Sequence, residues 1–206
     1  MYRIILASES PRRIEIMKQM GIPCDVMPAR VEEVTAENGP EGTVKSLSRL
    51  KARWVADNIK ADDDLIIIGA DTIVHHNGRI LGKPRNRNEA IEMIMGLSGS
   101  THEVYTGVCI IIRRIGNETG DGIREEEISF SVCTRVDVNP LTREQAEDYA
   151  DTKEPYDKAG AYAIQGGFGI YIKVIHGDYY NVVGFSIARI YEELLARGIN
   201  IKKIKK

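Results

Sequence analysis

The sequence predicts an α/β fold, in which buried strands alternate with amphipathic helices. The main observation is the stretch 65–72, where a leucine and three consecutive isoleucines indicate a strand buried on both faces. A second observation is the apolar run 2–7, which leads directly into a helical pattern. The third is the Asn77-Gly78 pair between two short β-prone runs, the strongest short-range signal for a hairpin.

The end of the 65–72 strand is a candidate for substrate approach. Gly69 and Ala70 remove side-chain bulk immediately before Asp71 and Thr72. Ligands of open α/β sheets bind beyond the carboxyl ends of the strands, which is where Asp71 would lie. Taken alone, the stretch is equally compatible with a core strand that ends in an acidic turn. The rest of the chain has to decide between these two interpretations.

Size and composition limit the classes of protein. The 206 residues, 43% of them hydrophobic, fit one domain or one domain with two lobes around a cleft. A net charge of -2 and 6% aromatic residues argue against a nucleic-acid-binding surface, so an anionic substrate would need locally clustered cations. Three widely spaced cysteines indicate neither a disulfide framework nor a zinc site, which favours a reduced, cytoplasmic setting. The apolar start is too short for a signal peptide or a membrane span.

The junction between the first strand and the first helix is a candidate anion site. Ser10 suits the N-cap, Pro11 suits the first helical position, and Gly21 marks the expected end of the helix. Arg12 and Arg13 would add two guanidinium groups to the free N–H groups of the first turn, a combination that binds phosphate or carboxylate. Two surface arginines without such a role are the alternative.

The segments before the central strand are a second strand, a polar loop and a helix. Residues 23–28 are expected to form the strand, and the loop after it carries the adjacent carboxylates Glu32 and Glu33, which by default would be solvated. Residues 42–59 are expected to form a helix with one apolar face. Lys51 lies on the rest of that helix, where a solvated cationic face is the default interpretation.

After the central strand, the predicted hairpin joins residues 73–76 to 79–81 and brings Lys83 close to the strand that carries Asp71. Asn88 is expected to cap the next helix. Residues 102–113 and 128–138 are predicted to form an antiparallel pair, with a polar loop at 116–127 between them.

The last third begins with a capping box, Thr142 and Gln145, which predicts a helix through Ala150. Residues 154–167 have no clean period, and an irregular segment of this length inside a compact domain is more often functional than filler. A second hairpin is expected between 171–175 and 179–183. A closing helix over 185–197, a stop at Gly198 and a frayed lysine-rich tail complete the prediction.

The candidate chemistry rests on carboxylates and cations near the ends of these elements. The chain lacks a Walker A loop, a dinucleotide fingerprint, a zinc-type histidine spacing and a nucleophile elbow. Carboxylates without histidine or thiolate partners suit a hard divalent ion such as Mg²⁺ bound together with substrate phosphates. The pattern therefore favours metal-dependent hydrolysis of a phosphorylated small molecule. The residues that support it are Glu33, Asp71, Asp157, Arg12, Arg13, Lys51, Lys83 and Lys158.

Several short motifs follow one another along nearly the whole chain, namely Ser8-Glu9-Ser10-Pro11-Arg12-Arg13, Glu32-Glu33, Gly69-Ala70-Asp71-Thr72, Gly82-Lys83-Pro84, Asp157-Lys158-Ala159-Gly160 and Ile164-Gln165-Gly166. In this order they resemble the motifs of the Maf family of nucleotide pyrophosphatases. The resemblance implies a single domain over 1–206, with an elongated mixed sheet flanked by helices and two lobes around a cleft, as in inosine triphosphatase-like proteins. It also implies cleavage of a nucleoside triphosphate into a monophosphate and pyrophosphate.

The resemblance further implies roles for individual residues. Asp71 would activate water, Glu33 would assist it or hold Mg²⁺ or Mn²⁺ together with Asp71, and Lys51, Lys83, Ser10 and Arg13 would hold the triphosphate. Asp157 and Lys158 are expected to bind substrate as well. Arg12, Thr72 and Gln165 match the subgroup that acts on dTTP and UTP rather than the 7-methyl-GTP subgroup. A nucleotide-binding regulator of cell division with little turnover is the alternative from another class, and a homodimer stays open.

Overall fold

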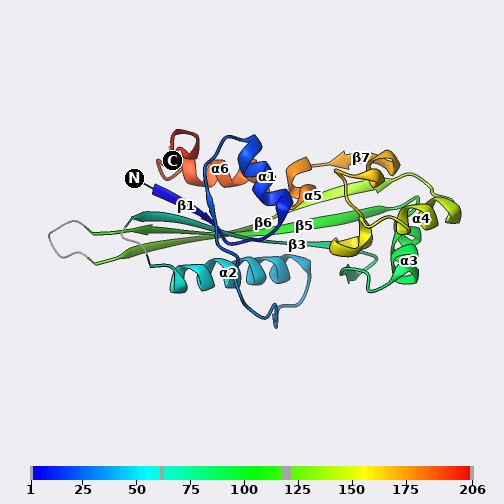
Figure 1. The fold of residues 1–206 in the computed structure, drawn as a ribbon, viewed down its shortest axis with the longest axis horizontal. Helices are drawn as coiled ribbons and strands as arrows, with labels where there is room; N and C mark the ends of the chain where they lie inside the picture. Colours follow the sequence, from blue (N-terminus) through cyan, green and yellow to red (C-terminus); the bar gives the residue numbers. More distant parts are fainter. Residues whose placement is uncertain (1, 61–62, 117–121, 205–206) are drawn as a thin grey trace. The chain divides into compact units, whose positions relative to one another are not determined.

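The computed structural model describes residues 2–60, 63–116 and 122–204, and within them it confirms the α/β class. A mixed seven-stranded sheet has the strand order β2-β1-β3-β5-β6-β7, and β4 pairs with β3 off this path (Figure 1). The chain forms two compact units. Unit 1 comprises Met1–Asp71, Gly107–Ser131 and Gly184–Lys206, and unit 2 comprises Thr72–Thr106 and Val132–Val183. The long strands β3 (Asp64–His76), β5 (Thr101–Arg114) and β6 (Arg124–Val138) contribute residues to both units.

In unit 1, the sheet forms around the two apolar stretches that the sequence singles out. Strand β1 (Tyr2–Leu6) pairs in parallel with β3, with Leu6 opposite Ile68, and also in parallel with β2 (Asp25–Val26). The second strand is therefore much shorter than the predicted 23–28. Because parallel strands end at the same edge of a sheet, the carboxyl ends of β1 and of the first part of β3 lie side by side.

Helices cover both faces of the sheet in unit 1. Helix α2 (Pro40–Asn58) lies on one side, and α1 (Pro11–Gln19) and α6 (Ile187–Leu195) lie on the other (Figure 1). Strand residues on the α2 side pack against the apolar face of that helix in one core cluster, comprising Ile5, Ala7, Ala52, Val55, Ala56, Leu65, Ile67, Cys109 and Ile111. Their neighbours Ile4, Leu6, Ile66 and Ile68 are equally buried and point to the opposite face, since successive strand residues alternate.

Two strand glycines allow α2 to approach the sheet closely. A Cβ atom at Gly107 would lie 2.2 Å from the Val44 carbonyl oxygen, and one at Gly69 would lie 2.3 Å from the Ser48 carbonyl oxygen. Both distances are far shorter than any real contact, and the atoms involved belong to the backbone of α2. Helix and sheet therefore touch main chain to main chain at these two positions.

Unit 2 confirms the predicted Asn77-Gly78 hairpin and two helices. The hairpin joins β3 to β4 (Arg79–Leu81), with φ angles of 49° at Asn77 and 74° at Gly78, which suit a type I′ turn. Helix α3 is Arg87–Leu97, and α4 (Arg143–Ala150) begins with the predicted capping box of Thr142 and Gln145. Strands β5 and β6 are neighbours, as expected, and residues 117–121 of the predicted loop lie outside the described residues.

The core of unit 2 is aromatic on the side of its irregular segment. Residues 154–171 include three short 3-10 turns, Pro155–Asp157, Ala159–Ala161 and Gly167–Tyr171, so the absence of a clean sequence period is explained. Phe168 is fully buried there. The core cluster comprises Val74, Ala90, Ile91, Ile94, Leu97, Val104, Val136, Val138, Leu141, Ala146, Tyr149, Ala150, Ala161, Tyr162 and Phe168.

The second predicted hairpin is wrong. Strand β7 (Ile172–His176) exists, but Tyr179–Val183 forms helix α5, and β7 pairs with β6 instead. Asp178 starts the helix, because its carboxylate accepts a hydrogen bond from the Tyr180 N–H at 2.8 Å. The backbone N–H of Asp178 in turn donates to the Thr134 hydroxyl on β6 at 3.1 Å.

The start of the predicted frayed tail is ordered, and residues 205–206 lie outside the described residues. Helix α6 is followed by Gly198, with a φ of 75°, as expected for a helix stop. Ile201–Lys203 then forms a 3-10 turn in which Ile201 is fully buried. Among the described residues, no helix is both long and apolar enough to cross a membrane.

The N-cap of α3 is Asn86, not the predicted Asn88. The Asn86 side chain accepts a hydrogen bond from the Glu89 N–H at 3.0 Å, whereas Asn88 lies inside the helix and is exposed. We expect Asn86→Ala to lower the free energy of unfolding by about 1 kcal/mol. Asn88→Ala, the matched control, should change it by less than about 0.5 kcal/mol. Urea unfolding of both variants measures the difference, and equal effects would contradict the assigned cap.

Candidate active site

Asp71 and Lys51 form the centre of the candidate site, which lies entirely in unit 1. Asp71 lies within β3 and not at its end as predicted, because the strand continues to His76; the Asp71 side chain is 10% exposed. The Lys51 ammonium, on α2, donates to Asp71 Oδ1 at 2.6 Å. The same nitrogen lies 2.9 Å from Glu33 Oε1, which comes from the loop between β2 and α2 and is half exposed. One ammonium group therefore bridges a buried carboxylate and an exposed one.

Arg13 is buried behind Asp71 rather than displayed on the first turn of α1. Its Nε donates to the Gly184 carbonyl oxygen at 2.8 Å, and its Nη1 donates to the Ala70 carbonyl oxygen at 2.9 Å and to the Ser8 hydroxyl at 2.9 Å. The guanidinium thus binds the peptide that immediately precedes Asp71. It brings a second positive charge next to the carboxylate and fixes the backbone from which that carboxylate projects.

Burial and charge oppose each other at this site. Desolvation raises the pKa of Asp71 above the ordinary value of an aspartate, and the charges of Lys51 and Arg13 only partly reverse that effect. Desolvation also lowers the pKa of Arg13, to about 10. This value is still well above neutral pH, where the guanidinium therefore stays charged. The result is a carboxylate that is more basic than usual and held in place by two cations. This combination is typical of a general base.

The donor set of the site fits a hard divalent cation that is shared with substrate. Asp71 Oδ1 and Glu33 Oε1 converge on one nitrogen, so two carboxylate oxygens already meet at a single point. No group of three or more His, Cys, Asp or Glu side chains within the described ranges could hold a metal by itself. Mg²⁺ is commonly held by one or two carboxylates together with substrate phosphates, so the pair suffices for that mode of binding.

The other predicted residues of unit 1 surround the start of α1. Ser10 occupies the N-cap position, but its side chain makes no capping bond, and its N–H donates to the Ser8 hydroxyl at 3.3 Å. Arg12 is partly buried in the first turn, next to Arg13. The structure therefore brings together Ser10, Arg12, Arg13, Glu33, Lys51 and Asp71 within unit 1, and their roles toward a substrate stay predictions.

The remaining predicted residues lie in unit 2, where two of the predicted motifs meet. Lys83 is exposed, and the preceding Gly82 accepts a hydrogen bond from the Gly160 N–H at 3.0 Å. The Lys158 ammonium donates to the Glu154 carbonyl oxygen at 2.8 Å and lies 2.5 Å from Asp157 Oδ1. The loop that carries Lys83 thus lies beside the segment with Asp157 and Lys158. A groove shared by these residues and Asp71 stays a prediction.

Thr72 and Gln165, the predicted specificity residues, have different surroundings within unit 2. The Thr72 hydroxyl lies 2.9 Å from the hydroxyl of the buried Thr106, which donates to the Asn181 carbonyl oxygen at 2.9 Å. Gln165 is exposed at a turn that precedes the last of the three 3-10 turns.

Sequence reasoning missed two partners of Arg13, namely Ser8 and Gly184. Ser8 is buried, with 7% exposure, and its position directly after an apolar strand was an available signal. Gly184 contributes a main-chain carbonyl group, which every residue type carries, so that no pattern of side chains could have identified it.

These observations define an α/β protein with a desolvated carboxylate held by two cations on a core strand. The chain belongs to the Maf family, because the family model described as Maf-like protein matches residues 3–197. The expected resemblance is thereby confirmed.

Similar curated proteins carry the name dTTP/UTP pyrophosphatase. One from Lachnoclostridium phytofermentans is 48% identical over 203 residues, which cover 98% of this chain and 99% of the relative. One from Bacillus cereus is 45% identical over 202 residues, which cover 98% of each protein. Among solved structures, a HAM1 protein from Coxiella burnetii matches with a TM-score of 0.46 and 12% identity over 96% of this chain and all of that chain.

Proposed function

We propose that this protein hydrolyses nucleoside triphosphates, with dTTP and UTP as its substrates, to the nucleoside monophosphate and pyrophosphate. The observation that supports the proposal most is the buried ion pair of Asp71 and Lys51 at 2.6 Å, in which a desolvated carboxylate on a core strand could act as a base. Membership in the Maf family supports the reaction class, and the names of relatives at 45–48% identity support the substrates.

In the proposed reaction, water attacks the α-phosphorus and the bond from that phosphorus to the oxygen bridging the α and β phosphates breaks. Asp71 takes a proton from the attacking water, the leaving group departs as pyrophosphate, and Asp71 later returns the proton to solvent. Lys51 fixes the orientation of Asp71, and Arg13 fixes the peptide of Ala70 behind it. Arg12, Ser10 and Lys83 would bind phosphate oxygens, because cations neutralise the charge of a triphosphate.

A divalent cation is part of the proposal. Asp71 and Glu33 would hold Mg²⁺ or Mn²⁺, which when bound neutralises phosphate charge and polarises the phosphoryl group. Displacement of Lys51 from one of the two carboxylates would leave its ammonium available for a phosphate oxygen. A cytoplasmic setting is also proposed, with the three free cysteines as its support.

A panel of nucleotides tests the proposal. We expect pyrophosphate release from dTTP and UTP in the presence of Mg²⁺ or Mn²⁺, and a changed base preference when the panel is repeated with Gln165→Glu. A glutamine amide offers one donor and one acceptor, whereas a glutamate carboxylate only accepts, so the variant loses a donor to a pyrimidine carbonyl group. Gln19→Glu, the same change at another exposed glutamine, is the control. Tight binding without any product would favour the regulatory alternative, and a preference for 7-methyl-GTP would reassign the subgroup.

The pH dependence of the reaction follows from the raised pKa of Asp71. Asp71 accepts a proton only when ionised, so kcat/KM should fall as the pH drops through a pKa above the ordinary aspartate range. Lys51→Gln removes the cation that lowers this pKa most, and we expect the acid limb of the normalised profile to move to higher pH. Lys45→Gln, on the exposed side of the same helix, should leave the limb unchanged. A limb that moves to lower pH in Lys51→Gln would contradict the assignment.

A further inference from the structure

The turn that carries Gln165 is held from both sides by two side chains. Before it, the Ala163 N–H donates to the Tyr149 hydroxyl oxygen at 3.1 Å. After it, the Gly167 N–H donates to Glu154 Oε2 at 3.0 Å. The two side chains are themselves joined, because the Tyr149 hydroxyl donates to Glu154 Oε1 at 2.6 Å. A continuous chain of hydrogen bonds therefore links the main chain two residues before Gln165 to the main chain two residues after it.

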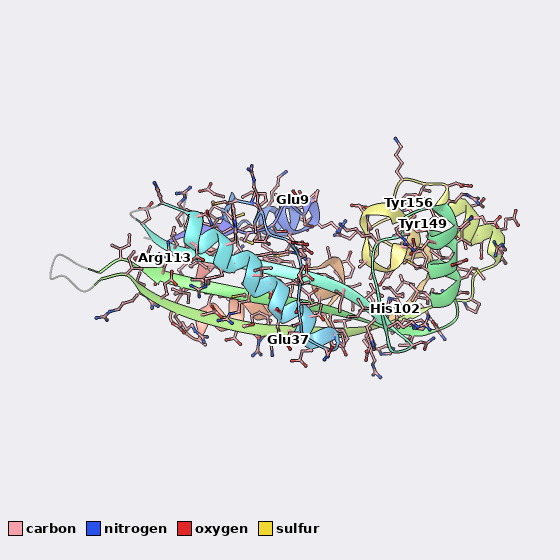
Figure 2. All side chains as sticks on the ribbon, turned by 90° about the horizontal axis from the view of Figure 1, so that it is seen from below. Glu9, Glu37, His102, Arg113, Tyr149 and Tyr156 are labelled. Carbon is pink, nitrogen blue, oxygen red and sulfur yellow. The ribbon has the colours of Figure 1, made fainter. Side chains whose placement is uncertain are left out.

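The ends of this turn are also anchored in the core of unit 2. Phe168 is fully buried, and its ring centroid lies 5.1 Å from that of Tyr149 and 4.9 Å from that of Tyr162. Ala163 is buried as well. Figure 2 labels Tyr149 and Tyr156 in this part of the molecule. Gln165 is thus an exposed side chain on a turn whose two ends cannot move freely.

Contact between the Glu154 carboxylate and the peptide after Gln165 is close. A Cβ atom at Gly166 would lie 2.2 Å from both carboxylate oxygens, so a larger residue there would require the Glu154 side chain to move away. Glu154 is fixed in turn, because its N–H donates to the Thr152 hydroxyl and its carbonyl oxygen accepts from the Lys158 ammonium at 2.8 Å. This part of the main chain is therefore held by Tyr149, which is buried, and by Glu154, which is partly buried.

We infer that Tyr149 and Glu154 are positioning residues that fix the amide of Gln165 for recognition of the pyrimidine base. The inference rests on the proposed function, and it extends base selection from one exposed residue to the pair that holds its turn. A hydrogen bond discriminates between bases only when its donor and acceptor are held within a fraction of an ångström. Burial and the bond to Glu154 raise the pKa of Tyr149, so its hydroxyl stays protonated and donates at every working pH.

The test compares UTP with CTP, whose bases present opposite donor and acceptor patterns next to a shared carbonyl group. Uncleavable α,β-methylene analogues of both nucleotides are used, so the ratio of their Kd values reports base selection without turnover. The variants are Tyr149→Phe, which removes the shared hydroxyl, and Glu154→Ala, which removes the carboxylate. Tyr156→Phe is the matched control, since its hydroxyl donates to the Ala150 carbonyl oxygen at 2.7 Å and makes no bond to the Gln165 turn.

We expect the Kd ratio to fall about tenfold in Tyr149→Phe and in Glu154→Ala, and to stay unchanged in Tyr156→Phe. A merely structural role would weaken the binding of both analogues equally and leave the ratio intact, which would overturn the inference. An equal loss of selectivity in Tyr156→Phe would overturn it as well. Pyrophosphate release from UTP by the wild-type protein is measured in parallel, and its absence would refute the proposed function rather than the positioning role. Should Glu154→Ala fail to fold, Tyr149→Phe decides alone.

Discussion

Asp71→Asn is expected to lower kcat for pyrophosphate release from dTTP by about 10²–10⁴-fold, the usual contribution of a general base. Asparagine has the same shape as aspartate and can still accept a hydrogen bond from Lys51, but its amide cannot take the proton of the attacking water. The loss should therefore appear in kcat, with a smaller change in KM. Steady-state assays with saturating Mg²⁺ measure both parameters.

Asp25→Asn is the matched control for this variant. Asp25 Oδ2 lies 2.6 Å from Arg3 Nε, the same separation as in the Asp71–Lys51 pair, but Asp25 is on the exposed strand β2. Its replacement should leave kcat within about twofold, since surface ion pairs contribute little. Near wild-type turnover in Asp71→Asn would remove Asp71 from its assigned role.

Loss of fold is not expected to explain the effect of Asp71→Asn. Because burial raises the pKa of Asp71, the folded state binds a proton at this site more tightly than the unfolded chain does. As the pH rises through that pKa, ionisation of Asp71 therefore lowers the free energy of unfolding. Asparagine has nearly the same shape but cannot ionise, so the variant does not lose this stability at neutral pH. Thermal unfolding of the variant at pH 7 checks that its midpoint does not fall.

Gly107→Ala is expected to destabilise the protein by at least about 3 kcal/mol, or to prevent folding. The added Cβ would lie 2.2 Å from the carbonyl oxygen of Val44, 2.3 Å from its carbonyl carbon and 2.8 Å from the backbone nitrogen of Lys45. These are main-chain atoms of α2, so relief requires the whole helix to move away from the sheet. Urea unfolding measures the loss.

Gly96→Ala, in helix α3, is the control, and it is not expected to lower the free energy of unfolding. Gly96 lies in α3, and a Cβ atom there would meet no atom within 4 Å. Alanine is favoured over glycine in a helix by at most about 0.5–1 kcal/mol, and Gly96 lies in the last turn of α3, so this variant should be as stable as the wild type or slightly more stable. A Gly107→Ala variant as stable as Gly96→Ala would contradict the close helix–sheet approach.

Local patterns predicted the parts of the fold that depend on neighbouring residues. Three isoleucines in a row predicted β3, Asn77-Gly78 predicted its hairpin, and the Thr142 capping box predicted the start of α4. The prediction failed for Tyr179–Val183, where an aromatic, valine-rich run suits a strand by propensity. Its helix depends on Asp178 and on Thr134, which is 44 residues away in the sequence.

The candidate site was predicted only in part, for a similar reason. Asp71 follows a strong strand signal, which predicted its place on β3, but the strand does not end there and continues to His76 in the hairpin with β4. Lys51 looked like part of a solvated helix face, and only the packing of α2 against the sheet brings it to Asp71. Arg13 was expected to face an anion, yet it is buried on carbonyl groups that include that of Gly184, 171 residues away. A contact between residues so far apart in the sequence cannot be predicted from the pattern of neighbouring residues.

Gly69 has a consequence for the ion pair of Lys51 and Asp71 as well as for packing. The α2 atoms closest to its missing side chain belong to Ser48 and Ala52, the residues on either side of the helical turn from which Lys51 extends. Because Gly69 has no side chain, α2 lies directly against the strand backbone. The Lys51 side chain on α2 is therefore long enough to reach the Asp71 carboxylate, two residues further along β3. A larger residue at position 69 would move the helix away and separate Lys51 from Asp71, so the ion pair depends on the close contact between helix and sheet.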